Sequence, residues 1–198
     1  MIYEFAMKIS KTLEMNNLIK DEDIDFYRYG LELIIITILK GAGLLILAAI
    51  IGIVKETIVF IIFFTSLRVQ AGGVHSQSVW KCFVITCLMT FSAIYISKLI
   101  PQDYEKIYQY FMMIFALMGI WLFAPMDTPN RRLNAKEKKK YRKRSIATII
   151  IACFVIISIG LLGSNYQIYA TIAVTAIAFE GVTLIPINIK KSNFKEVF

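Results

Sequence analysis

The chain has 198 residues, of which 58% are hydrophobic, and it contains only four prolines. A soluble domain of this size cannot bury so much apolar surface in one core, so the composition excludes an ordinary soluble protein and indicates a membrane protein. The net charge of +8 would suit a nucleic-acid-binding protein, but most of the excess lies in one segment between apolar stretches. Membrane orientation explains such a segment, and we do not expect nucleic acid as a partner.

The first 25 residues mix charged and apolar side chains and lack the short apolar core and cleavage site of a secretory signal. Phe5, Ile9 and Leu13 recur at a spacing that places them roughly on one face of a helix. We therefore expect residues 1–25 to form an amphipathic segment on the membrane surface. No repeat or low-complexity linker divides the rest, so residues 1–198 are expected to form one integral-membrane domain.

Apolar stretches long enough for membrane-spanning helices recur along the chain. A helix rises about 1.5 Å per residue, so about 20 residues are needed to cross a hydrocarbon core of about 30 Å. The second stretch offers about half of that length, so either the bilayer thins there or the helix continues past Arg68 and draws the following glycine-rich turn towards membrane depth. We favour the longer helix. The expected fold is all-α and polytopic, with about six transmembrane helices at 31–54, 57–67, 79–100, 107–124, 146–163 and 167–187.

Residues 126–145 lie between the fourth and fifth stretches and hold most of the basic excess. Loops rich in Lys and Arg face the cytoplasm, so this basic loop orients the chain in the cell membrane. With six spans, both termini and the turn at 68–78 lie on the cytoplasmic side, whereas losing the short second span would move the N-terminus outside. The basic residues are Arg131, Arg132, Lys136, Lys138, Lys139, Lys140, Arg142, Lys143 and Arg144.

The single histidine, His75, follows Gly72 and Gly73 and lies seven residues before Cys82. The thiolate is the nucleophilic form of cysteine, and a free thiol with a pKa of about 8.5 is mostly protonated at neutral pH. A helix N-terminus, the neighbouring Lys81 and a histidine base would each favour the thiolate. A continuous helix would separate residues 75 and 82 by about 10.5 Å along its axis, so the chain must break between them, and the two glycines permit a tight turn.

The same residues also have a plainer interpretation, which their spacing alone favours. His75 is then a polar residue at the membrane interface, and Cys82 is a small hydrophobic residue packed in a helix. Cys87 and Cys153 fit this interpretation better, because each lies in an aliphatic stretch. Three cysteines without paired spacing favour neither a disulfide framework nor a metal site, so we expect no metal and no cofactor.

Two separated motifs add weight to the catalytic interpretation. The first is RVQAGGVH at 68–75, followed by Cys82, and the second is APMDTPN at 124–130, followed by KEKKKY at 136–141. In this order they resemble the signature of the AgrB (accessory gene regulator protein B) family, and the resemblance runs from about residue 30 to the region of Pro186.

The resemblance implies a membrane cysteine endopeptidase that processes an AgrD-type precursor peptide for quorum sensing. By the motif match, Cys82 is the nucleophile and His75 its base. The thiolate attacks the scissile carbonyl, releases the C-terminal tail of the precursor and keeps the remainder as a thioester. An internal cysteine or serine of the precursor then closes the ring as a thiolactone or a lactone. The precursor and the lipid bilayer are the implied partners, and a homodimer is left open.

Other residues have less specific roles. Arg68 pairs with a substrate carboxylate, steadies the turn, or anchors a helix end on the cytoplasmic side. Gln70, Ser76 and backbone N–H groups are candidates for stabilising an oxyanion, and nothing in the sequence singles one out. Glu180, near the middle of the last expected span, must face a helix interior or a polar cavity, with Lys40 or Arg68 as its partner. It has either a structural role or a role in orienting the catalytic histidine.

Two other classes of function remain open from the sequence. A small permease subunit would use Lys40, Arg68 and Glu180 as a polar pathway, with His75 as a proton relay. A membrane scaffold would need neither His75 nor Cys82. Substituting Cys82 separates these classes, because a peptidase loses cleavage with Cys82→Ala and is badly impaired with Cys82→Ser, whereas a transporter should tolerate the serine.

Overall fold

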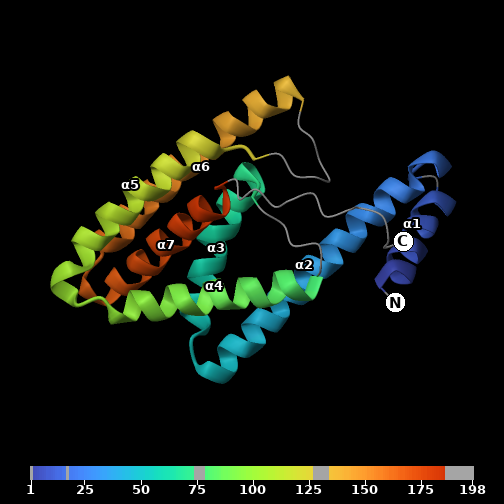
Figure 1. Ribbon diagram of the computed structural model, residues 1–198. Coiled ribbons are helices and arrows are strands. Elements are labelled where there is room, and N and C mark those ends of the chain that lie inside the picture. The colour runs from blue at the N-terminus through green and yellow to red at the C-terminus, as the bar shows by residue number, and fades with distance from the viewer. Residues whose placement is uncertain (1, 17, 74–78, 127–133, 186–198) are drawn as a thin grey trace.

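The computed structural model describes residues 2–16, 18–73, 79–126 and 134–185. Within these ranges the chain forms helices and no strand, which confirms the expected all-α fold (Figure 1). Two short 3₁₀ helices, η1 and η2, each lead into a longer α-helix. In chain order the elements are α1 Ile2–Met15, η1 Asp21–Asp23, α2 Ile24–Ile51, α3 Val54–Ala71, α4 Val79–Leu99, η2 Gln102–Tyr104, α5 Glu105–Phe123, α6 Ala135–Leu161 and α7 Ser164–Thr183.

Four helical segments of the described chain are long and apolar enough to cross a membrane: Asp21–Ile51, Val79–Leu99, Gln102–Phe123 and Ala135–Leu161. The other two helices expected to span are α3 and α7. The 18 residues of α3 reach about 27 Å, close to the thickness of a hydrocarbon core. Because α3 ends at Ala71, the structure confirms that the short second stretch belongs to a helix that continues past Arg68.

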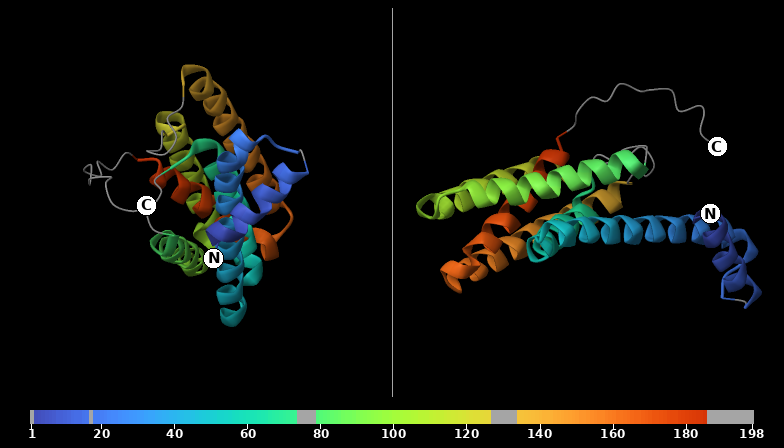
Figure 2. Two further views of the ribbon diagram at one scale, coloured as in Figure 1. Left: turned by 90° about the vertical axis from the view of Figure 1, so that its right-hand side faces the viewer. Right: turned by 90° about the horizontal axis from the view of Figure 1, so that it is seen from below.

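The helix α7 lies at the centre of the bundle. It packs against α3, α4, α5 and α6, and Figures 1 and 2 show it between these helices. Every residue from 170 to 178 is buried. Small residues allow close approach: a Cβ added to Gly119 of α5 would lie 3.3 Å from the Cα of Gly181 in α7. Since α7 faces protein, it can carry polar side chains that would be costly against lipid.

Polar side chains hold α7 in register against α5. The Gln109 side chain donates to Oε1 of Gln167, at 3.0 Å, and to Oγ1 of Thr171, at 2.9 Å. One turn further along α7, the hydroxyls of Tyr108 and Thr175 lie 3.0 Å apart. Each contact satisfies a buried polar group, so sliding α7 along α5 would break all of them together.

The helices α1 and α2 reach away from the bundle. Figures 1 and 2 show α1 beside the N-terminal part of α2, and the guanidinium of Arg28 lies 4.6 Å from the ring centre of Tyr3. The N-terminal helix forms as expected but ends at Met15. By contrast, α2 begins at Ile24, seven residues before the predicted span, because the acidic run forms η1 and the first turn of α2. Acidic side chains favour helix N-termini, which explains this earlier start.

The basic segment differs from the expected loop over residues 126–145, because α6 begins at Ala135. A capping box starts this helix. The Glu137 amide donates to Oδ1 of Asn134, at 2.9 Å, and the Asn134 amide donates to Oε2 of Glu137, at 3.0 Å. Lys, Arg and Glu are good helix formers, so the basic residues from 136 to 144 extend the apolar part of α6 without a break. Arg142 lies 6.0 Å from the ring centre of Trp121, near the end of α5.

Candidate active site

Three helix ends meet at the first of the two sequence motifs. The helix α3 ends at Ala71, α5 at Phe123 and α7 at Thr183. Just beyond α5, the Met126 amide donates to the carbonyl oxygen of Ala71, at 2.9 Å. The last turns of α3 and α7 are joined through Arg68, and this end of the bundle therefore holds the residues that precede His75.

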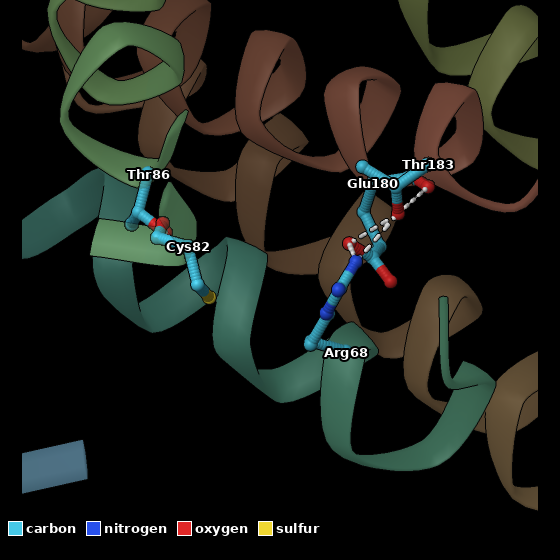
Figure 3. A network of polar contacts seen from close by, with 5 residues as sticks. All are labelled: Arg68, Cys82, Thr86, Glu180 and Thr183. Atoms are coloured by element: carbon cyan, nitrogen blue, oxygen red, sulfur yellow. Dashed lines mark hydrogen bonds and ion pairs between the residues drawn. The ribbon is translucent and has the colours of Figure 1, made fainter. Parts of the chain in front are cut away.

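Arg68 and Glu180 form a buried ion pair. Nη1 of Arg68 lies 3.3 Å from Oε2 of Glu180 and 2.8 Å from Oγ1 of Thr183, as Figure 3 shows. The side chain of Glu180 is 0% exposed and that of Arg68 is 18% exposed. Burying a carboxylate is costly without a partner, and the guanidinium offsets that cost. Of the two partners considered from the sequence, Lys40 and Arg68, the structure pairs Glu180 with Arg68.

Glu180 lies closer to a helix end than the sequence indicated. The predicted last span ran from 167 to 187, which put Glu180 near its middle, but α7 ends at Thr183. The Thr183 hydroxyl lies 2.9 Å from the Glu180 carbonyl oxygen and 3.0 Å from its Oε2. The Thr183 side chain therefore closes the last turn of α7 and also contacts the ion pair.

The two glycines of the motif have backbone conformations that few other residues adopt. Gly72 has φ 82°, and a Cβ added there would lie 2.8 Å from the carbonyl oxygen of Met126. Gly73 has φ 133°, and an added Cβ would collide with Nη1 of Arg68 and lie 2.9 Å from Oγ1 of Thr183. Positive φ and close neighbours both favour glycine. The chain thus leaves α3 in a tightly enclosed turn.

Cys82 is the fourth described residue of α4 and is half-buried. The Thr86 hydroxyl donates to the carbonyl oxygen of Cys82, at 2.8 Å. In Figure 3 the sulfur of Cys82 points towards α3, whereas the guanidinium of Arg68 is directed at Glu180 and Thr183 and not at this sulfur. The ion pair therefore does not hold the thiol of the nucleophile candidate.

His75 and Ser76 lie outside the described residues, so the predicted contact between His75 and Cys82 stays a prediction. What the structure describes are the two ends of that segment. Gly73 is buried beside Arg68, and α4 is described from Val79. The helix α3 has ended before residue 75, since Gly72 and Gly73 follow it in non-helical backbone.

The remaining candidates have specific environments. Gln70 is half-buried, and its Oε1 is buried without a hydrogen-bond partner among the described residues. An oxyanion needs donors, so Gln70 could serve only through its amide nitrogen. Cys87 and Cys153 are buried thiols. Across the described part of the chain, no group of three or more His, Cys, Asp or Glu residues could hold a metal ion.

Comparison with known proteins identifies the family. The sequence model of the family described as Accessory gene regulator B, or AgrB, matches residues 2–184. The chain belongs to the AgrB family. Membership places it in the accessory gene regulator quorum-sensing system and associates it with AgrD-type peptides.

Several relatives are themselves called AgrB-like. One from Clostridium acetobutylicum is 28% identical over 182 residues, which cover 90% of this chain and 84% of the relative. One from Listeria innocua is 31% identical over 136 residues, covering 67% of this chain and 66% of the relative. A third, from Clostridium perfringens, is 27% identical over 156 residues, covering 76% and 71%. No solved structure matches the chain.

Two residues that contribute to this AgrB-family site, Thr183 and Met126, were not predicted from the sequence. Thr183 is three residues after Glu180, so both lie on one face of α7, and that spacing could have indicated a shared role. Met126 belongs to the second motif, but a hydrogen bond from its backbone to Ala71 leaves no mark in the sequence.

Proposed function

We propose that this AgrB-family protein is a membrane cysteine endopeptidase that cuts an AgrD-type precursor peptide. Cys82 is the nucleophile and His75 the base. One observation carries the proposal: the half-buried Cys82, the fourth described residue of α4, directs its sulfur towards α3, the helix that ends in the enclosed glycine turn before His75 (Figure 3). The thiolate is the nucleophilic form of cysteine, and a neighbouring histidine base favours it.

The reaction proceeds by acyl transfer. His75 removes the proton from the Cys82 thiol, and the thiolate attacks the scissile carbonyl of the precursor. The tetrahedral intermediate collapses as the protonated His75 gives its proton to the nitrogen of the departing C-terminal tail. The rest of the precursor stays on Cys82 as a thioester. An internal thiol or hydroxyl of the precursor then attacks this thioester, which closes the ring and releases Cys82.

The thioester must survive until the internal nucleophile reaches it. Excluding water from the site slows hydrolysis, and the length of α3 favours such exclusion. Its last turn is buried at Leu67 and Ala71, directly before the glycine turn. Introducing charged residues within 57–67 should therefore raise the share of hydrolysed product over cyclic product.

The site is proposed to face the cytoplasm. The basic first turns of α6 lie beside the end of α5, where Arg142 contacts Trp121, and α5 leads into the contact between Met126 and Ala71. Basic segments stay on the cytoplasmic side, so the helix ends beside them share that side. The precursor would then be cut where it is synthesised.

Reconstituted protein incubated with AgrD-type precursors tests the function. We expect a covalent adduct on Cys82, no cleavage with Cys82→Ala and badly impaired cleavage with Cys82→Ser. Cys87→Ala is the matched control, because it removes a buried thiol from the same helix and should leave cleavage intact. Full cleavage by Cys82→Ala would refute the proposal, and tolerance of Cys82→Ser would favour the permease instead.

A further inference from the structure

The last turn of α7 is firmly placed against α5. A Cβ added to Gly181 would lie 3.7 Å from the Cα of Ala116, and the backbone of Gly181 lies against Gly119. Such close backbone contacts leave little freedom for one helix to move against the other. Glu180 and Thr183 flank this contact on either side in sequence. Their side chains are therefore presented to α3 from a rigid support.

The end of α3 is attached to that support at two neighbouring places. Met126, which follows α5, is hydrogen-bonded to Ala71 through its backbone. Glu180 and Thr183 of α7 hold Arg68, one turn earlier in α3. Neither attachment involves a side chain of α4. The turn at Gly72 and Gly73 is thus positioned by Met126, which follows α5, and by two side chains of α7.

These contacts distinguish the roles left open for Arg68. A guanidinium already paired with a fully buried carboxylate has little net charge with which to attract a substrate carboxylate. Its Nη1 occupies the space where a side chain of Gly73 would begin. Arg68 therefore supports the turn itself, since Gly73 packs directly on the guanidinium.

We propose that Glu180 and Thr183 are positioning residues that act through Arg68 to hold the turn at Gly73 and so set the direction of the chain towards His75. The proposal rests on the proposed endopeptidase function. His75 follows Gly73 by two residues, so a change in the Gly73 backbone changes where the histidine can reach. Glu180 and Thr183 contact neither the thiol nor the substrate in this role. Losing either of them should weaken activation of Cys82 without removing the nucleophile.

The test measures Cys82 reactivity in protein that lacks the other two thiols through Cys87→Ala and Cys153→Ala. Alkylation by iodoacetamide is followed against pH in the reconstituted chain, together with precursor cleavage. Glu180→Gln keeps the shape of the side chain but removes the buried charge that faces Arg68, and we expect cleavage to fall at least about tenfold. Thr183→Val removes the hydroxyl that accepts a hydrogen bond from Arg68 and donates to Glu180, and it should lower cleavage several-fold. Both variants, Glu180→Gln and Thr183→Val, should change the pH dependence of the Cys82 alkylation rate so that it approaches that of His75→Ala.

A double variant tests whether Glu180 acts through Arg68. Arg68→Gln combined with Glu180→Gln should be no worse than Arg68→Gln alone, because a residue that acts through another adds no further loss. Tyr108→Phe is the matched control. It removes a buried hydrogen bond to α7 at Thr175, away from the site, and should leave the alkylation profile unchanged. Gel filtration reports the folded fraction, to which all rates are normalised.

The two proposals fail in different ways. If Glu180→Gln and Thr183→Val keep the parent profile and cleavage rate while Cys82→Ala and His75→Ala abolish cleavage, positioning is wrong and the endopeptidase stands. If Tyr108→Phe shifts the profile as much as Thr183→Val, the effect comes from general loosening of α7 and positioning is again wrong. If Cys82→Ala still cuts, the endopeptidase function itself is wrong.

Discussion

Replacing Gly73 by alanine is the most direct perturbation of the turn. The new Cβ would collide with Nη1 of Arg68 and lie 2.9 Å from Oγ1 of Thr183. Two costs add. A side chain in a sparsely populated backbone region costs about 1–3 kcal/mol. The guanidinium must also move away from Glu180, and complete loss of a partner from a buried pair costs about 3–5 kcal/mol.

Gly163 provides a control that separates these two costs. It has φ 134°, nearly the value at Gly73, but a Cβ added there meets nothing within 4 Å. Gly163→Ala therefore introduces the backbone strain without the collision. If the Arg68 guanidinium is only partly displaced, Gly73→Ala loses about half of the full value, about 2 kcal/mol. Because about 1.4 kcal/mol is one factor of ten, the share of folded protein that keeps the original turn should be more than tenfold lower in Gly73→Ala than in Gly163→Ala.

Cleavage of an AgrD-type precursor by the two reconstituted variants, normalised to folded protein, is the assay. We expect Gly73→Ala to cleave at least about tenfold more slowly than Gly163→Ala. Thermal unfolding measured alongside shows how much of each cost falls on stability. Equal cleavage by the two variants would show that the space beside Arg68 is not needed, and the reasoning on the enclosed turn would be refuted.

Three further predictions concern packing, capping and thiol burial. Gly119→Leu should force α5 and α7 apart and lower stability by about 1–3 kcal/mol, and an unchanged unfolding temperature would contradict the close contact. Asn134→Ala removes the capping box of α6 and should cost about 1 kcal/mol, seen as roughly fivefold faster hydrogen exchange in the first turn, whereas unchanged exchange would argue against the cap. Cys87 and Cys153 should react with iodoacetamide more slowly than Cys82, and equal labelling measured by mass spectrometry would contradict their burial.

The sequence predicted the helices well where apolar runs were long. The cores of α2, α4, α5 and the apolar part of α6 lie where the runs indicated. Helix ends were less predictable. Hydropathy marks where lipid or protein surrounds a helix and not where its hydrogen bonds begin, so the basic first turns of α6 were interpreted as a loop. Asn134 and Glu137 have the spacing of a capping box, and that local signal would have corrected the start.

The candidate site was predictable only in part. A carboxylate in an apolar helix must have a partner, and this reasoning led to Arg68 and Lys40 as candidates for Glu180. The choice between them depends on how α3 and α7 pack, which joins residues more than a hundred positions apart. The same holds for Met126 and Ala71, because a backbone hydrogen bond can form at any residue type and its partner is set by the tertiary fold alone.

The enclosed position of α7 has a consequence for biogenesis. The four helices around it all precede it in the chain, so the groove is synthesised before the helix that fills it. Gln167, Thr171 and Thr175 find their hydrogen-bond partners only when α7 docks, which favours late insertion against protein over a free existence in lipid. The ion pair between Arg68 and Glu180 forms in that same event. A nascent chain therefore carries Cys82 long before it can assemble the complete site.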